Sequence, residues 1–375
     1  IIGPYESRLN ATFFKSAKNK LRAHQGLITI GITGSYGKTN VKFILRDILS
    51  KQYKVLATPA SFNTAMGISR VVNDQLKPEH QVFIAEMGAT HVGDIKELVG
   101  LVRPKYGIIT SIGPRHMDTF GSIENIASTK FELVQGLPRD GLAVFGWGDD
   151  YINRLYALCK HDKCRIGMDD DPGAFMVARN LSFSDRGSAF DMVCADGEAV
   201  RCRTRLLGSY NVKNILLAAA LARKMGMEMG QIAEAVKNLS PIEHRMQLIP
   251  GDLTVIDDTL NEDADSAFEA FRVLSQMPGR RIVVTPGVGE QGGREADVNF
   301  ALGTVMADCA DAVVLVGRRA FTRSIVRGMM QSGFSSSNLH TADDMDDASE
   351  ILQEISDPGD TVLFESRIPE YEEEG

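Results

Sequence analysis

The sequence lacks two features that would point to a membrane or to nucleic acid. No uninterrupted apolar run approaches the roughly 20 residues that a membrane-spanning helix needs. There is also no excess of positive charge, because 41 basic residues stand against 49 acidic ones and give a net charge of −8. A nucleic-acid-binding domain usually concentrates Lys and Arg on one face. We therefore expect no membrane span in this chain and no nucleic-acid partner.

Cysteine is also scarce. Five Cys in 375 residues, an odd count, argue against a disulfide framework and favour a reducing compartment, so we expect a cytoplasmic protein. Cys159 and Cys164 flank His161, a spacing that a zinc site also uses. No second Cys/His pair follows at zinc-finger spacing, so scattered structural thiols are the favoured interpretation and zinc is the alternative.

The chain is longer than one hydrophobic core usually supports, and its composition is that of a globular protein. At 375 residues, with 43% hydrophobic and 24% charged side chains, two or three domains are expected. The sequence begins Ile1-Ile2-Gly3, with neither an initiator Met nor a secretory signal pattern. We interpret it as a piece of a longer protein.

Strands and helices alternate along most of the chain. This alternation predicts an α/β fold with a mainly parallel sheet covered by helices on both faces. Buried strands are expected at 27–32, 54–58, 81–86, 106–110 and 143–145, and again at 253–257, 281–285, 311–316 and 361–364. Between about 163 and 207, shorter alternating segments with turns at 185–187 and 196–197 predict antiparallel hairpins. A Pro/Gly turn near 246–251 marks the expected domain boundary.

A glycine-rich segment joins the first expected strand to an amphipathic helix. It reads Thr33-Gly34-Ser35-Tyr36-Gly37-Lys38-Thr39. Glycines let the backbone wrap phosphates at a helix N-terminus, a Lys adds positive charge, and a Thr hydroxyl can ligate Mg²⁺. Ile32 stands where the standard loop has its first glycine, so the loop is shorter than that of ordinary GTPases. The segment predicts ATP binding; a chance glycine-rich turn is the alternative.

Three further residues with suitable chemistry follow the loop. Glu86 ends the strand at 81–86, His116 follows the strand at 106–110, and Lys130 lies on an amphipathic helix fourteen residues later. Doubly wound sheets build their sites at the carboxyl ends of strands. Each residue alone is a weak signal, but together with the phosphate loop they predict a nucleotide and metal site.

These motifs occur in the order found in a known family. The segments concerned are 33–39, 63–67, 86–88, 112–116, 120–122, Lys130, 208–214, 244–247 and 257–261. They resemble those of the Mur ligases, the ATP-dependent amide-forming enzymes of peptidoglycan precursor synthesis. Within that family, 245–247 and 257–261 most resemble the branch that adds D-alanyl-D-alanine to UDP-muramoyl-tripeptide. The segments 284–287 and 362–365 resemble a Gram-positive version of that branch.

The resemblance implies a domain arrangement. It consists of a lead-in at 1–25, a central P-loop ATPase domain at 26–246 with small antiparallel hairpins, and a Rossmann-like C-terminal domain at 247–375. The usual UDP-binding domain is not found before residue 26. Gram-positive versions can carry a membrane-embedded N-terminal region there, so the full-length protein is expected at the inner face of the membrane.

The resemblance also implies roles at the phosphate loop. Lys38 and the amides of 34–37 would hold the ATP phosphates. Thr39 and Glu86 would ligate one Mg²⁺, and His116 a second. Lys130 matches the carbamylated lysine of the family, whose neutral amine reacts with CO₂ to give an anion that binds metal. An ammonium at that place would instead repel Mg²⁺.

Six further residues match family positions outside the loop. These are Asn211 and Asn214 near adenine, Asp258 at the ribose, Arg245 at the phosphates, and Asn63 and Thr64 beside the substrate and the transferred phosphoryl group. The expected catalytic set is Lys38, His116, Lys130 and Arg245. For Asp258 the alternative is a cap of the helix that starts near 265. The loop at 287–293 departs from a dinucleotide-binding pattern and is interpreted as facing the substrate.

The expected reaction is that of a monomeric ligase. Its substrates would be ATP, a UDP-muramoyl-peptide and an amino acid or dipeptide amine. Two alternatives stay open: another amide ligase of the folylpolyglutamate type, or a nucleotide-binding protein that regulates or scaffolds an envelope complex.

Overall fold

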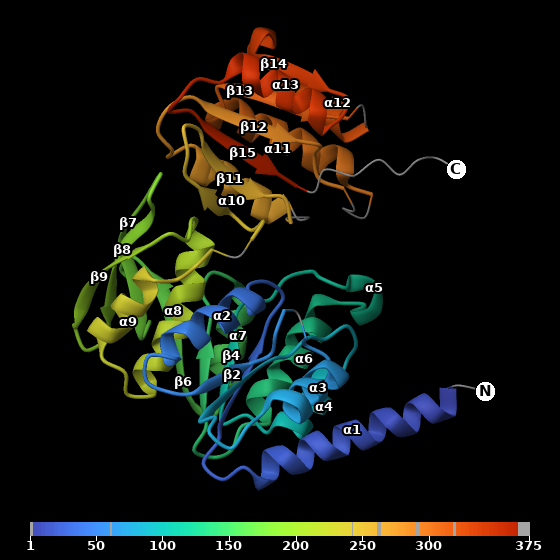
Figure 1. Ribbon diagram of the computed structural model, residues 1–375, viewed down its shortest axis with the longest axis vertical. Coiled ribbons are helices and arrows are strands. Elements are labelled where there is room, and N and C mark those ends of the chain that lie inside the picture. The colour runs from blue at the N-terminus through green and yellow to red at the C-terminus, as the bar shows by residue number, and fades with distance from the viewer. Residues whose placement is uncertain are drawn as a thin grey trace. The chain divides into compact units, whose positions relative to one another are not determined.

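The computed structural model describes residues 3–60, 62–241, 243–260, 264–289, 293–317 and 320–366 (Figure 1). The chain divides into two compact units. The first comprises 1–180, 190–202 and 211–238, and the second comprises 181–189, 203–210 and 239–375. Each unit has a hydrophobic core of its own.

A nine-stranded sheet in the order β2-β3-β1-β4-β5-β6-β7-β8-β9 organises the first unit. Its strands are β1 (Ile28–Thr33), β2 (Val55–Ala57), β3 (Val82–Glu86), β4 (Tyr106–Ile109), β5 (Leu142–Phe145), β6 (Asp162–Met168), β7 (Met176–Ser184), β8 (Gly187–Cys194) and β9 (Ala199–Thr204). All pairs from β2 to β7 are parallel. Short turns then join β7 to β8 and β8 to β9. The prediction of a mainly parallel sheet with added hairpins is confirmed.

Two strands differ from their prediction of antiparallel pairing. β6 pairs in parallel with β5, Leu142 opposite Asp162, and β7 pairs in parallel with β6, Ile166 opposite Met176. For β6 the reason is helix α7 (Asp150–Leu158), which connects β5 to β6. Such a crossover returns the chain in the same direction, whereas the alternation of side chains alone does not distinguish the two pairings.

Helices cover the first sheet on both faces, as parallel strand pairs require (Figure 1). One group consists of α1 (Gly3–Ala23), α3 (Ala65–Gln75), α4 (Asp94–Val102) and α6 (Ile123–Gln135), which pack on one another. The other group consists of α2 (Lys38–Leu49), α8 (Ser209–Lys224) and α9 (Met229–Lys237). The polar lead-in is therefore a helix, and its Ala17 and Leu21 are buried in the same core as α3 and α4.

A six-stranded sheet in the order β10-β11-β15-β12-β13-β14 organises the second unit. Its strands are β10 (Gln247–Ile249), β11 (Thr254–Asp258), β12 (Arg281–Thr285), β13 (Ala312–Val316), β14 (Leu339–Ala342) and β15 (Thr361–Glu365). Only β10 runs antiparallel to its neighbour among the described strands. Its helices are α10 (Ala264–Leu274), α11 (Glu295–Cys309), α12 (Ala320–Gln331) and α13 (Met345–Ile355). The expected α/β architecture is confirmed.

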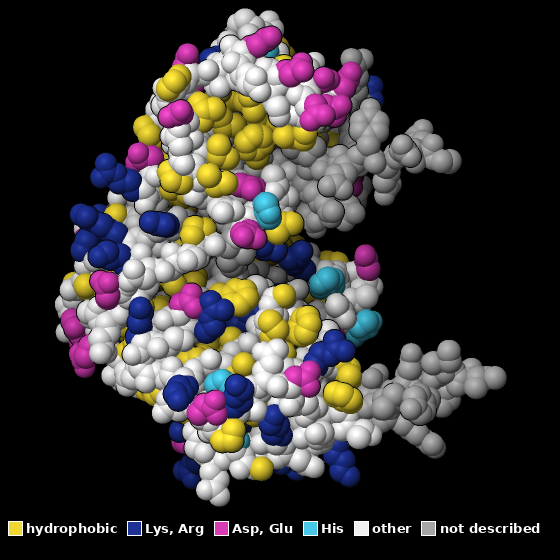
Figure 2. Space-filling view, in the orientation of Figure 1, with side chains coloured by type: hydrophobic (Ala, Val, Ile, Leu, Met, Phe, Trp, Pro, Cys, Tyr) yellow, Lys and Arg dark blue, Asp and Glu magenta, His cyan; other side chains and the backbone are white. Residues whose placement is uncertain are grey.

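Charged side chains of both signs lie on the face of the molecule that Figure 2 shows. On the side seen in Figure 2, basic and acidic side chains are interspersed over the first unit, and acidic ones gather in the second unit near α13. Within the described residues, no helix is both long and apolar enough to cross a membrane.

The register of the first sheet determines where its functional side chains meet. Strand β1 lies between β3 and β4, with Ile32 opposite Glu86 and Thr33 opposite Ile109. The carboxyl ends of these three parallel strands therefore share one edge. The glycine-rich loop leaves β1 at this edge, beside Glu86.

Candidate active site

Two glycines give the loop its shape. At Gly37, which precedes α2, the backbone has a left-handed φ of 77°. Gly34 has a φ of 152°, and a Cβ there would lie only 1.9 Å from Oγ1 of Thr110 at the end of β4. Side chains are disfavoured at positive φ, so these glycines allow the chain to pass close to β4 and to start α2 at Lys38.

The loop is fastened to the segment that follows β4. The buried Ser35 hydroxyl donates to the carbonyl of Gly113 at 2.9 Å and accepts from the amide of Gly113 at 2.8 Å. The amide of Tyr36 donates to the Ser111 hydroxyl at 3.1 Å. These bonds fix the loop before any ligand arrives.

The fixed loop has the properties of a phosphate site. Nζ of Lys38 donates to the carbonyls of Gly34, at 2.8 Å, and Ser35, at 3.3 Å, so its positive charge lies over the loop. The first amides of a helix have no acceptor within the helix, and they attract anions. The residues present therefore fit the phosphates of a nucleotide.

Glu86 forms the oxygen-rich part of the site. Its side chain is 1% exposed. Oε1 accepts hydrogen bonds from the Thr39 hydroxyl at 3.1 Å and from Nδ2 of Asn63 at 3.2 Å. Mg²⁺ in nucleotide sites is usually held by one or two carboxylates together with phosphate oxygens. The described residues contain no cluster of three His, Cys, Asp or Glu, but the Thr39–Glu86 pair beside the loop fits such a metal.

The second oxygen of Glu86 has a partner that the sequence did not indicate. Nζ of Lys42 lies 2.9 Å from Oε2, and this lysine side chain is 0% exposed. The ammonium also donates to the carbonyl of Ala60. Burial lowers the pKa of Lys42, while Glu86 acts in the opposite direction. Lys42 follows Thr39 by three residues on α2 and so shares its helix face. This spacing is the sequence signal that could have placed Lys42 near Glu86.

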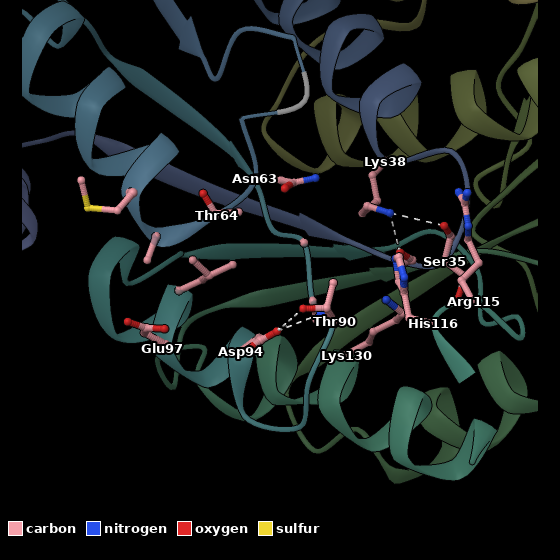
Figure 3. A pocket seen from close by; sticks show the side chains of 16 residues that line it. Ser35, Lys38, Asn63, Thr64, Thr90, Asp94, Glu97, Arg115, His116 and Lys130 are labelled. Carbon is pink, nitrogen blue, oxygen red and sulfur yellow. Dashed lines mark hydrogen bonds between the residues drawn. The ribbon is translucent and has the colours of Figure 1, made fainter. Parts of the chain in front are cut away.

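A pocket of about 450 Å³ opens beside the loop (Figure 3). Its lining includes Ser35, Lys38, Asn63, Thr64, Met66, Thr90, Asp94, Glu97, Arg115, His116 and Lys130. The cationic side chains lie together near the loop, whereas Asp94 and Glu97 lie toward the other end. The pocket thus brings together the predicted residues Lys38, Asn63, Thr64, His116 and Lys130. Arg115 is an addition that the sequence did not single out.

Lys130 has the electrostatic environment of a reactive amine. It is 4% exposed, and within the described residues its ammonium has no hydrogen bond or ion pair. Burial, followed by the nearby charges of Lys38 and Arg115, lowers the pKa of Lys130 to about 7. A large fraction of this side chain is therefore neutral near pH 7, the form that reacts with CO₂.

His116 is held in an unusual backbone conformation at the same pocket. It has a φ of 56° and directly precedes α5 (Met117–Phe120). Burial lowers the pKa of His116, and the charges of Arg115, Lys130 and Lys38 lower it further. The neutral imidazole can ligate a metal.

The two asparagines of α8, Asn211 and Asn214, lie beside the phosphate loop and the start of α2. Oδ1 of Asn211 accepts from Nδ2 of Asn40 at 3.1 Å. Oδ1 of Asn214 lies so close to Gly37 that a Cβ there would be 2.6 Å away. Nδ2 of Asn214 is buried and has no hydrogen-bond partner among the described residues. A buried unsatisfied donor is costly, and a nucleobase beside the loop would supply its acceptor.

Arg245 and Asp258 belong to the second unit. Asp258 ends β11, is buried, and accepts a hydrogen bond from the amide of Met246 at 2.9 Å. This bond leads to the turn before β10. Residues 261–263, directly before α10, lie outside the described residues, so the alternative of a cap for that helix stays a prediction. Arg245 is exposed in that turn, between His244 and Met246, which both have positive φ. In the loop at 287–293, residues 290–292 lie outside the described residues.

Two family models match the chain in succession. The Mur ligase middle domain matches residues 32–222, and the Mur ligase, glutamate ligase domain matches residues 244–367. The chain belongs to the Mur ligase family. Mur ligases are ATP-dependent, ADP-forming amide ligases, which agrees with a phosphate loop beside Glu86 and with the expected enzyme class.

Named relatives and a solved structure agree with the family. The chain is 31% identical over 364 residues to the UDP-N-acetylmuramoyl-tripeptide–D-alanyl-D-alanine ligase of Mycobacterium bovis. The aligned region covers 91% of this chain and 70% of that protein. The chain is 29% identical over 305 residues to the enzyme of that name from Escherichia coli, covering 80% and 67%. The crystal structure of MurF from Acinetobacter baumannii superimposes with a TM-score of 0.82 at 25% identity, over 96% of this chain and 77% of that one.

Replacing Lys42 tests whether the buried ion pair between Lys42 and Glu86 stabilises this Mur ligase site. Lys42→Met leaves the Glu86 carboxylate buried without its counter-charge, which should lower the free energy of unfolding by about 3–5 kcal/mol. Urea denaturation measures the change. The double variant Lys42→Met/Glu86→Gln should recover much of the loss.

Lys237 offers a matched control, because it is exposed and lies 3.9 Å from Glu234. Lys237→Met should leave the urea midpoint almost unchanged. A Lys42→Met protein as stable as the wild type would contradict the ion pair.

Proposed function

We propose that this chain carries the ligase activity that joins D-alanyl-D-alanine to the tripeptide carboxylate of UDP-N-acetylmuramoyl-tripeptide. The observation that carries the proposal is one pocket that is lined by the phosphate loop, by Asn63, which bonds to Glu86, and by the amine of Lys130, which has no partner among the described residues. The names of the relatives in E. coli and M. bovis support the choice of substrates.

The first step is phosphoryl transfer. An oxygen of the tripeptide carboxylate attacks the γ-phosphorus, the bond to the β–γ bridging oxygen breaks, and ADP leaves. Lys38 and the first amides of α2 would neutralise the phosphate charge. Thr39 and Glu86 would hold Mg²⁺, which neutralises further phosphate charge when it is bound. Arg245 is proposed to reach the phosphates from the second unit.

The second step forms the amide. The amine of the dipeptide attacks the acyl carbon and loses a proton, and the tetrahedral intermediate collapses as inorganic phosphate leaves. Its oxyanion needs positive charge close by, which Lys38 and Arg115 in the lining of the pocket would provide. The carboxylate substrate would lie along Asn63 and Thr64.

The remaining assignments complete the nucleotide and metal sites. Asn211 and Asn214 would contact adenine, and Asp258 the ribose. Lys130 would carry a carbamate that ligates Mg²⁺ together with His116. A carbamate is consistent with the environment of this lysine, because an anion is favoured where Lys38 and Arg115 disfavour an ammonium. A monomeric state and a cytoplasmic location at the inner face of the membrane stay predictions.

Omitting each substrate in turn tests the proposed reaction. With ATP and Mg²⁺, ADP release should require UDP-N-acetylmuramoyl-tripeptide and should rise to a steady rate only when D-alanyl-D-alanine is added. L-alanyl-L-alanine is the matched control and should give little turnover. Steady ADP release with a folate and glutamate, but not with the muramoyl substrate, would favour the alternative ligase.

Lys130→Ala tests the carbamate. Amide formation should fall by about 100-fold or more, since the anion that would hold Mg²⁺ at the transferred phosphoryl group is lost. Short-chain carboxylates such as acetate should restore part of the rate by supplying the missing anion. Coupled assay of phosphate release measures both effects.

The matched control is Lys105→Ala, at an exposed lysine whose partner Asp140 is also exposed. It should keep the wild-type rate and show no response to acetate. Full activity of Lys130→Ala without added carboxylate would exclude the proposed role.

A further inference from the structure

The chain has a single tryptophan, and it lies just beyond the carboxyl end of β5, an interior strand of the sheet that holds the site. Trp147 follows β5, and its side chain is 36% exposed. Phe145, two residues earlier, is fully buried. The core therefore ends at Phe145, and the indole of Trp147 stands outside it at the carboxyl end of the strand.

One line of contacts connects Trp147 to the phosphate loop through β4. At Gly146, directly before the tryptophan, a Cβ would lie 1.9 Å from the carbonyl oxygen of Thr110. The hydroxyl of the same Thr110 donates to the carbonyl of Tyr36 in the loop. The backbone that carries Trp147 is therefore packed against the residue that fastens the loop.

A second line of contacts runs through α8, which lies beside α2 (Figure 1). Nζ of Lys213 lies 4.9 Å from the centroid of the Trp147 ring. The next residue, Asn214, has its Oδ1 against Gly37 of the loop, and its buried Nδ2 has no partner among the described residues. Two separate elements thus connect the strand end that carries the indole to the phosphate loop.

The indole also lies near a charged pair. Asp171 is paired with both terminal nitrogens of Arg165, and this pairing, with a smaller contribution from Trp147, lowers the pKa of Asp171. A rigid aromatic surface loses little conformational freedom when a second ring stacks on it.

We propose that Trp147 is the stacking surface for the purine base of the bound nucleotide. In this arrangement the base lies against the indole, and Nδ2 of Asn214 donates to an acceptor on its edge. The inference rests on the proposed use of ATP and adds the residue that recognises the base. Aromatic stacking contributes affinity for any nucleobase, because every base has a π-face.

The experiment separates the base from the phosphates. Isothermal titration of the full chain with ATP and with inorganic tripolyphosphate, both with Mg²⁺, gives the two affinities. Trp147→Ala should weaken ATP binding by roughly tenfold, within the range found for base–aromatic stacking, and leave tripolyphosphate binding unchanged. Trp147→Phe, which keeps an aromatic face, should stay within about threefold of the wild type.

The wild-type protein supplies a second readout, because all of its tryptophan emission comes from one site. ATP should quench this emission, and tripolyphosphate should not. The matched control is Phe13→Ala, which removes an exposed aromatic ring from α1 and should change neither affinity.

The outcomes separate this inference from the proposed function. Unchanged ATP affinity in Trp147→Ala would overturn the stacking role while leaving the ligase proposal intact. Equal losses for ATP and tripolyphosphate would show a structural role and also overturn it. If Trp147→Ala does not fold, Trp147→Phe and the wild-type emission decide. A wild-type chain that binds tripolyphosphate but not ATP would contradict both proposals.

Discussion

The buried ion pair between Lys42 and Glu86 is the interaction on which the rest of the site depends. It joins α2, which starts at the phosphate loop, to the end of β3. A carboxylate that is 1% exposed is stable as an anion only if its charge is balanced. Because Lys42 occupies Oε2, the other oxygen of Glu86 faces Thr39 and Asn63. The pair therefore holds together the side chains that we propose for the metal and the substrate.

The pocket beside this pair gathers cationic side chains at one end. Lys38, Arg115 and His116 line it together with Lys130. Burial lowers the pKa values of His116 and Lys130, and the charges of the neighbouring cations lower both further. Anions are what such a pocket favours: phosphates, a carboxylate or a carbamate.

Much of this arrangement could be predicted from the sequence, because it depends on local patterns. The phosphate loop, Glu86 at a strand end and the strands at 281–285 and 361–364 all follow from short segments, and the fold agrees with them. The insertion of β15 between β11 and β12 could not be predicted, since strand order depends on contacts distant in sequence. Lys42 was missed for a related reason: a lysine on an amphipathic helix is usually solvated, and only its buried partner shows otherwise.

The central claim is that the pocket activates a carboxylate by transferring the γ-phosphoryl group of ATP to it. The most direct measurement uses UDP-N-acetylmuramoyl-tripeptide with ¹⁸O in its terminal carboxylate, followed by mass spectrometry of the phosphate released during amide formation. An acyl-phosphate intermediate passes one carboxylate oxygen to the phosphate, so the account predicts a single ¹⁸O atom in each phosphate. Amide formation with unlabelled phosphate would contradict it.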